Sequence, residues 1–143
     1  MKFTKFLKEI GTQGEVIEIG KVEKWLVCGG VGMLIPRGVN NLLGSESAGD
    51  KFNLVKSLRN ESLNDELELT KAILRDPNGN AKSIYRVFES ELGETIEIIN
   101  SKYGLLDKAD ILGYTELIES NKVVKYMLIF NGENLIGFIR GDY

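Results

Sequence analysis

The fold is decided by residues 94–140, which read ETIEIINSKYGLLDKADILGYTELIESNKVVKYMLIFNGENLIGFIR. The segment Thr95–Ile99 is rich in β-branched residues, which favours a short strand. Asn100 or Ser101 can then cap a helix over Lys102–Ala109, because a side-chain oxygen accepts a hydrogen bond from the free N–H groups of a first helical turn. Turn residues separate the three apolar runs that follow: Tyr114–Ile118, Val123–Phe130 and Leu135–Arg140. The segment is therefore predicted to form a strand, a helix and three antiparallel strands.

Glycine-containing turns predict further hairpins. Asn131-Gly132 favours a type I′ turn, because both residues tolerate a positive φ. Gly29-Gly30 is expected to join strands at Trp25–Cys28 and Val31–Ile35 in the same way. Other predicted strands are Glu15–Ile19, a strand with one wet face over Leu67–Ile73, and Ile84–Phe88 after a turn at Asp76–Asn80. Because runs of strand length outnumber helical periods, the chain is predicted to be α+β with antiparallel sheets.

The helices are expected to be short, to number two or three and to lie on one side of the strands. Phe3, Phe6, Leu7 and Ile10 fall at i, i+3, i+4 and i+7, which predicts an amphipathic helix that ends at Gly11. A second helix is predicted over Lys51–Arg59 with Asp50 as its cap. A helical turn at Val39–Leu43 and a linker over Gly44–Gly49 are also expected.

A chain of 143 residues predicts a single domain over residues 1–143. An alternative is two pseudo-repeated halves, about 1–43 and 94–143, joined by a middle hairpin region, 44–93. A lysine–aromatic pair opens each proposed helix, as an internal repeat would require: Lys2-Phe3, Lys51-Phe52 and Lys102-Tyr103. The predicted core residues are Trp25, Leu26, Leu34, Ile98, Leu128 and Ile136.

The residue types present limit which active sites and metal sites the chain can form. There is no histidine, which removes Ser-His and Cys-His nucleophile schemes and most zinc sites. Only oxygen-ligated ions such as magnesium remain, and Asp65, Glu66 and Glu68 could be read as ligands, but acids on an exposed strand edge more often prevent edge pairing. We therefore expect no catalytic residues, no metal and no cofactor.

The sequence also favours a cytoplasmic location. It has a single cysteine, Cys28, no signal peptide and no apolar run of membrane length.

The net charge of -3 argues against a simple polybasic nucleic-acid binder, but it allows an acidic protein with one basic face. Lys2, Lys5 and Lys8 repeat every three residues along the first predicted helix. Lysines in such a pattern more often form a solvated surface. The alternative interpretation is a helix that contacts phosphates.

The predicted unit of strand, helix and three strands resembles the half-domain of the DNA sliding clamps. The resemblance covers Met1–Pro36 and Glu94–Tyr143 and is one of topology and charge layout. It implies units that pair into a domain, domains that close into a ring around duplex DNA, and helices that line the hole with basic side chains. It also implies that Lys2, Lys5, Lys8, Lys102 and Lys108 face DNA phosphates. Asp107 and Asp110 depart from a purely basic helix face, and one chain of this length holds only about one clamp domain.

Three functions follow as hypotheses. The first is a non-enzymatic, clamp-like module on duplex DNA, encoded by a phage or mobile element, which implies a homo-oligomer. The second is a small acidic protein that binds and inhibits a protein partner, as immunity proteins and phage inhibitors do. The third is a magnesium enzyme built on carboxylates, against which stands the absence of an acidic pair flanked by lysine. No membrane association is expected.

Overall fold

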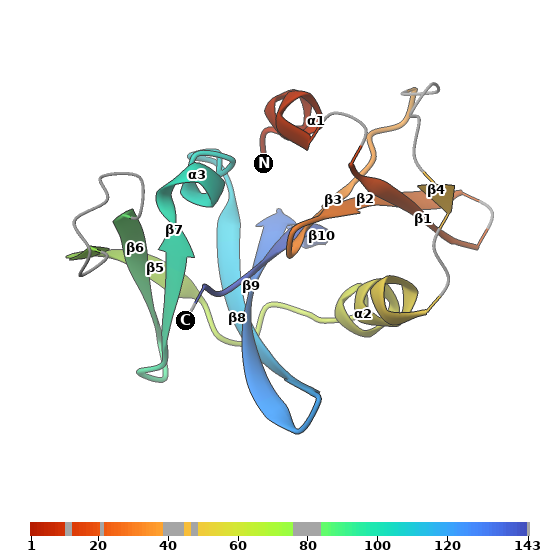
Figure 1. The fold of residues 1–143 in the computed structure, drawn as a ribbon. Helices are drawn as coiled ribbons and strands as arrows, with labels where there is room; N and C mark the ends of the chain where they lie inside the picture. Colours follow the sequence, from red (N-terminus) through yellow and green to blue (C-terminus); the bar gives the residue numbers. More distant parts are fainter. Residues whose placement is uncertain (11–12, 21, 39–44, 47–48, 76–83, 143) are drawn as a thin grey trace.

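The computed structural model describes residues 1–10, 13–20, 22–38, 45–46, 49–75 and 84–142 (Figure 1). Helices and strands alternate along the chain in short blocks. In chain order they are α1 (Phe3–Ile10), β1 (Glu15–Ile19), β2 (Glu23–Cys28), β3 (Val31–Leu34), β4 (Ser45–Glu46), α2 (Asp50–Leu58), β5 (Leu67–Arg75), β6 (Ile84–Ser90), β7 (Thr95–Ile99), α3 (Asn100–Tyr103), β8 (Ile111–Glu119), β9 (Lys122–Asn131) and β10 (Asn134–Arg140). The α+β class predicted from the sequence is confirmed.

The larger sheet has seven strands in the order β4-β1-β2-β3-β10-β9-β8. It contains two antiparallel meanders, β1–β2–β3 and β8–β9–β10, which meet where β3 pairs antiparallel with β10. Phe138 lies opposite Gly32 at the centre of this junction. Only β4 runs parallel to its neighbour β1, over two residue pairs. Two units, each a helix followed by three strands, are therefore joined through their third strands.

The smaller sheet has three antiparallel strands in the order β5-β6-β7. β7 was predicted as the first strand of the C-terminal unit, and it occupies Thr95–Ile99 as predicted. It pairs with β6 and therefore lies in a different sheet from β8, β9 and β10. The backbone of Asp65 links the sheets, because its carbonyl accepts a hydrogen bond from the Tyr114 N–H at 2.7 Å.

Alternating side chains of the larger sheet form two hydrophobic clusters on its opposite faces. The first cluster packs α1 and the smaller sheet against one face and includes Phe6, Leu26, Met33, Phe88, Ile96, Ile98, Met127, Ile129 and Ile139. The second cluster packs α2 against the other face and includes Ile17, Trp25, Val27, Val55, Leu58, Tyr126, Leu128, Phe130 and Phe138. α1 and α3 lie on the side of the first cluster and α2 lies on the other (Figure 1). The expectation that all helices share one side is therefore wrong for α2.

The predicted core residues divide between the two clusters. Trp25, Leu26, Ile98 and Leu128 are buried as expected. Leu34 and Ile136 are only partly buried and pack against the cluster edges. Leu34 is the last residue of β3, and Ile136 precedes the buried part of β10.

Two helix ends differ from the prediction. Asp50 is the first residue of α2 and makes no capping hydrogen bond, since Gly49 occupies the cap position. α3 ends at Tyr103, whereas a helix was predicted to extend to Ala109. The chain turns after Tyr103 because Leu105, only 2% exposed, enters the first cluster.

The predicted Gly29-Gly30 turn is confirmed, with φ values of 58° and 79°. The Asn131-Gly132 turn is shifted by one residue, because Asn131 pairs with Asn134 and leaves Gly132 and Glu133 in the loop. Of these two, only Gly132 has a positive φ, as the first central residue of a type II′ turn requires. The expected turn at Asp76–Asn80, the helical turn at Val39–Leu43 and half of the linker at Gly44–Gly49 lie outside the described residues. Within that predicted linker, Ser45–Glu46 form the short strand β4. Within the described ranges, the structure has no helix with the length and apolar character needed to cross a bilayer.

Candidate nucleic-acid interface

The lysines of α1 lie on its solvent side. Phe6 is 2% exposed and anchors the opposite side of the helix in the first cluster. Lys5 and Lys8 are three residues apart and lie on the helix surface away from Phe6, so both are exposed. Lys2, just before the start of α1, is exposed as well. The amphipathic pattern therefore predicted both the helix and its orientation.

The segment after α3 brings a fourth lysine to the same region. The backbone N–H of Lys2 donates to the Leu105 carbonyl at 2.8 Å, and the Lys5 Nζ donates to the Gly104 carbonyl at 3.2 Å. These bonds hold the start of α1 against the 104–110 segment, which carries exposed Lys108. We call the exposed residues Lys2, Lys5, Lys8 and Lys108 the α1 lysine face.

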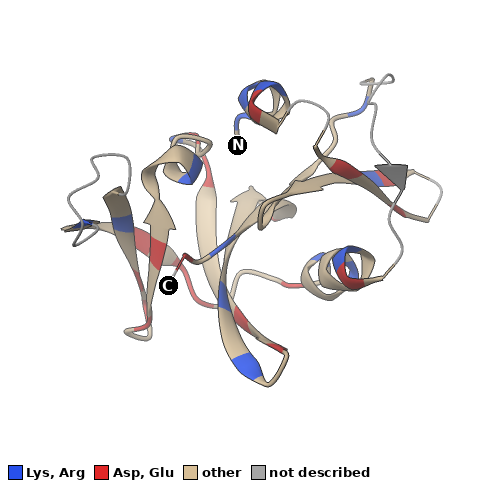
Figure 2. Cartoon of the chain, in the orientation of Figure 1, with Lys and Arg blue, Asp and Glu red and all other residues tan. Residues whose placement is uncertain are grey.

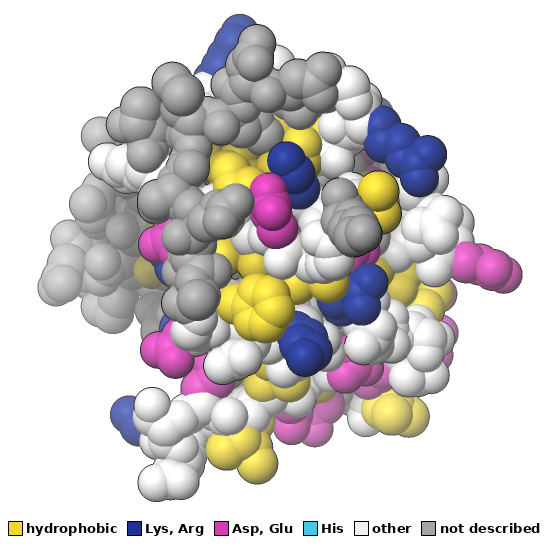
Figure 3. All heavy atoms as spheres, turned by 90° about the vertical axis from the view of Figure 1, so that its right-hand side faces the viewer, with side chains coloured by type: hydrophobic (Ala, Val, Ile, Leu, Met, Phe, Trp, Pro, Cys, Tyr) yellow, Lys and Arg dark blue, Asp and Glu magenta, His cyan; other side chains and the backbone are white. Residues whose placement is uncertain are grey.

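Acidic side chains reduce the charge of this face without cancelling it. Glu9 and Asp107 are exposed in the same two segments, so the four lysines outnumber them two to one. Basic and acidic positions both occur on α1 (Figure 2). Asp110 is withdrawn from the surface, because it binds the Met1 amine at 2.7 Å with a side chain only 6% exposed. From the side of β1 and α2, by contrast, basic and acidic side chains are interspersed (Figure 3).

Lys102 does not join the other predicted lysines. Its Nζ forms an ion pair with Asp142 at 3.0 Å, and the two side chains are 23% and 19% exposed. Asp142 is fixed further by accepting the Ile99 backbone N–H at 2.7 Å. Four of the five predicted site residues are therefore exposed on two segments that contact each other, whereas the fifth, Lys102, lines a groove.

That groove, about 450 Å³, has a lining that the sequence analysis did not identify. Its charged lining residues are Lys102, Lys122, Lys125, Arg140 and Asp142. They come from α3, β9, β10 and the segment after β10, so no local spacing in the sequence relates them. We call it the basic groove.

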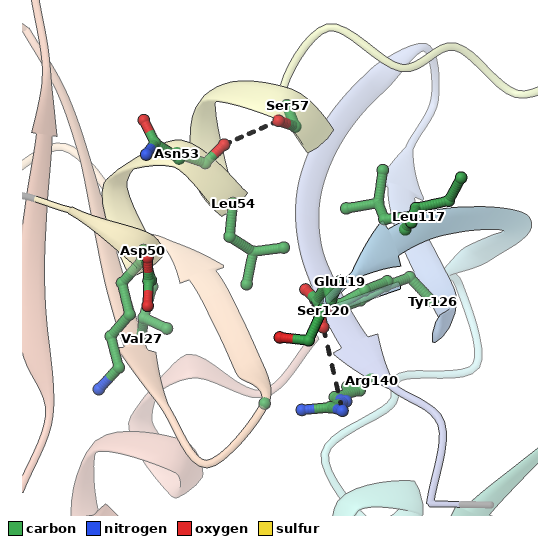
Figure 4. A pocket seen from close by; sticks show the side chains of 13 residues that line it. Val27, Asp50, Asn53, Leu54, Ser57, Leu117, Glu119, Ser120, Tyr126 and Arg140 are labelled. Carbon is green, nitrogen blue, oxygen red and sulfur yellow. Dashed lines mark hydrogen bonds and ion pairs between the residues drawn. The ribbon is translucent and has the colours of Figure 1, made fainter. Parts of the chain in front are cut away.

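A second groove, about 550 Å³, lies between α2 and the β8–β9 hairpin (Figure 4). Leu54 projects from α2 into it, and Glu119 and Arg140 form an ion pair at 3.9 Å on the opposite wall. The Tyr126 hydroxyl donates to Glu119 at 2.7 Å. Burial raises the pKa of Tyr126 above its ordinary value, and the hydrogen bond to Glu119 adds to the rise. Tyr126 is therefore a neutral donor here and not an acid–base group near neutral pH.

The tip of the same hairpin exposes two paired apolar side chains. Ile118 and Val123 lie opposite each other across β8 and β9 and are 79% and 61% exposed. Exposed apolar side chains that cluster are typical of protein-binding surfaces.

The acidic residues considered as metal ligands lie in different surroundings. Asp65 is 7% exposed and accepts the Leu92 N–H, so it is not on an exposed strand edge as expected. Glu66 and Glu68 line a groove of about 240 Å³ with Glu89 and Glu91. Among the described residues, no three acidic or cysteine side chains are arranged to hold a metal ion.

Comparison of the chain with protein family models, curated proteins and solved structures finds no match. The geometry of these surfaces is therefore the basis for a functional interpretation.

Proposed function

We propose that the protein is a non-enzymatic, cytoplasmic module that contacts the phosphates of duplex DNA through the α1 lysine face. The observation that carries the proposal is the packing of α1 against the 104–110 segment, because exposed Lys2, Lys5 and Lys8 then lie in or next to a helix that contacts the segment carrying exposed Lys108. Lysine ammonium groups neutralise backbone phosphates without reading bases. Binding through this face would therefore be independent of sequence.

The acidic remainder of the chain supports one orientation on DNA. The whole chain has a net charge of -3, so the surfaces outside the lysine face and the basic groove repel the phosphate backbone on balance. A few phosphate contacts give weak binding that falls steeply with salt, because each contact releases condensed counterions. The expected complex is weak, oriented and sensitive to ionic strength.

The two three-stranded meanders support the clamp-like form of the proposal, although β7, the first strand of the predicted unit, lies in the smaller sheet. Two units of a helix and three strands meet at β3 and β10, and α1 and α3 lie on the same side of the larger sheet. A ring around DNA built from a chain of this size needs several copies, so the proposal includes a homo-oligomer. A phage or mobile element is the proposed source.

Charge reversal tests the lysine face. Changing Lys2→Glu and Lys8→Glu together should lower affinity equally for unrelated duplexes and flatten the log–log salt dependence by roughly two, since each phosphate contact contributes about 0.9 to its slope. Neither side chain has a bonding partner among the described residues, so melting temperature should hardly change. The matched control, Lys71→Glu with Arg75→Glu, reverses two exposed charges on β5 and should leave binding unchanged.

Two outcomes would overturn this proposal. One is no duplex affinity at low salt, and the other is an equal loss in the α1 and β5 variants. Light scattering and a comparison of linear with circular duplexes test the ring separately, because a closed ring slides off free ends but stays on a circle. A monomer that binds both equally would refute the ring and leave the phosphate contacts.

A protein-blocking function is the second candidate. The observation that favours it is the exposed Ile118–Val123 pair beside the groove under α2. In this case Ile118→Ser with Val123→Ser should abolish inhibition of the target, whereas the Lys2/Lys8 variant should retain it. The paired variants thus separate the two functions.

A further inference from the structure

The basic groove combines residues from distant parts of the chain. Lys102 comes from α3, Lys122 and Lys125 from β9, and Arg140 from the end of β10. The Gly29-Gly30 turn forms another part of its lining. Only the folded chain places these four cations around one space.

Two of the cations are held in position by the protein. The Lys102 Nζ is fixed by Asp142, which the Ile99 N–H fixes in turn. The Lys125 Nζ donates to the Thr95 carbonyl at 2.6 Å. That carbonyl is neutral, so the charge of Lys125 is not cancelled by its partner.

The glycine turn lets these groups approach one another. A Cβ at Gly30 would lie 3.1 Å from the Arg140 Cβ and 3.8 Å from the Lys102 Nζ. The Gly30 carbonyl also accepts the Arg140 N–H at 2.8 Å. A side chain at this position would therefore occupy the space between Lys102 and Arg140.

The charge balance of the groove is opposite to that of the chain. Its lining holds four cations and one carboxylate, in a protein with 18 basic and 21 acidic residues. Glu119 pairs with Arg140 only at 3.9 Å, and Arg140 remains 52% exposed. Like charges gathered in this way repel one another, and a bound anion relieves the repulsion.

We propose that the basic groove binds the phosphate group of a phosphorylated ligand. A phosphate monoester carries up to two negative charges and three strong acceptor oxygens, which match several cations better than a single carboxylate does. The guanidinium of Arg140 can bond two of these oxygens at once. The phosphate can belong to a free phosphorylated molecule or to a nucleic-acid backbone. The inference does not depend on the α1 lysine face.

Pyrophosphate is a suitable probe for the experiment. Its titration into the ¹⁵N-labelled full chain at low salt should shift the amide signals of Gly29 and Gly30. Changing Lys122→Gln and Arg140→Gln together should weaken binding at least tenfold, because charge-assisted hydrogen bonds are lost. The control variant Lys71→Gln with Arg75→Gln removes the same two charges from β5 and should bind as the unchanged chain does. The inference is overturned if the two amides do not shift, or if both double variants bind pyrophosphate equally.

A duplex added to the pyrophosphate-bound chain identifies the source of the phosphate. Displacement of pyrophosphate from the groove, seen in the Gly29 and Gly30 signals of both the unchanged chain and the Lys2/Lys8 variant, assigns a nucleic-acid backbone. Unchanged glycine signals assign a free phosphorylated molecule. The Lys2/Lys8 variant keeps the groove intact, so a failure of the proposed DNA contact does not remove pyrophosphate binding.

Discussion

One face of the seven-stranded sheet is covered by a second sheet and by α1. Among the described residues, the opposite face is covered by the single helix α2. The first cluster is mostly aliphatic, because two layers supply side chains from both sides. The second cluster holds Trp25, Tyr126, Phe130 and Phe138, whose rings fill the space under a helix of nine residues. Large aromatic side chains, each of which buries about 150–250 Å², therefore supply apolar area that the short helix α2 does not.

Among the described residues, hydrogen bonding of buried polar groups is less complete on the second face. The Trp25 Nε1 is buried and has no hydrogen-bond partner among the described residues. A buried unpaired donor costs about 1–3 kcal/mol. Packing of the Trp25 ring against Phe138, with ring centroids 6.0 Å apart, offsets part of that cost.

Neighbouring residues of β9 test the two faces directly. Leu128 belongs to the second cluster and Ile129 to the first, and both are at most 1% exposed. Leu128→Ala and Ile129→Ala should each lower the free energy of unfolding by roughly 2–5 kcal/mol, measured by urea denaturation. A loss below about 1 kcal/mol for either variant would mean that its face contributes little to the core.

A substitution at the junction of β3 and β10 should have a smaller effect on stability, and this effect should be specific to the second face. A Cβ at Gly32 would overlap a ring carbon of Phe138. Gly32→Ala should therefore cost roughly 1–3 kcal/mol by overpacking. Adding Phe138→Leu should recover part of this loss, because the two residues interact directly. Strictly additive losses would show that the ring moves aside without cost.

Local sequence patterns predicted the positions of strands and turns better than they predicted which strands pair. The β-branched run at Thr95–Ile99 and the Gly29-Gly30 turn were placed correctly, because strand and turn preferences act over a few residues. The pairing of β7 with β6 and the junction of β3 with β10 were not predicted. Pairing of strands distant in the sequence depends on the total burial of all layers, and single strands carry no signal for it.

The candidate sites show the same limit. The exposure of Lys5 and Lys8 followed from the helical period of α1, whereas Lys2 is exposed just before the helix begins. Lys102 has the same charge and was grouped with them, but Asp142, 40 residues later, pairs with it. Charge type is visible in a sequence, whereas the partner that a folded chain supplies is not.

High pH provides a third test of the two faces. Tyr126 lies on the second face and Tyr114 on the first, and burial, followed by hydrogen bonds to Glu119 and Glu116, raises the pKa of each. A raised tyrosine pKa contributes stability that is complete below the ordinary value of about 10 and is lost as pH rises toward the folded value. The pH dependence of urea unfolding should therefore steepen above about pH 10.

Removing the hydroxyl of Tyr126 or Tyr114 separately shows how much each contributes to stability. Tyr126→Phe should cost about 1 kcal/mol near neutral pH, as expected for one buried hydrogen bond. Tyr114→Phe should cost less, since Tyr114 is only half-buried. Each variant should also lose part of the alkaline steepening. An unchanged alkaline profile in both variants would mean that these hydroxyls ionise normally.

The smallest expected effect concerns the start of α2, the helix that covers the second face. A capping aspartate typically contributes about 1 kcal/mol, but Asp50 makes no capping hydrogen bond and lies inside the first turn. Asp50→Ala should therefore cost no more than about 0.5 kcal/mol, the usual range for a surface substitution, with a small contribution from its charge near the helix N-terminus. Leu58→Ala in the same helix should cost roughly 2–5 kcal/mol, because Leu58 is 1% exposed. If the two costs were equal, α2 would be held by its first turn, and the aromatic cluster beneath it would not be what stabilises this face.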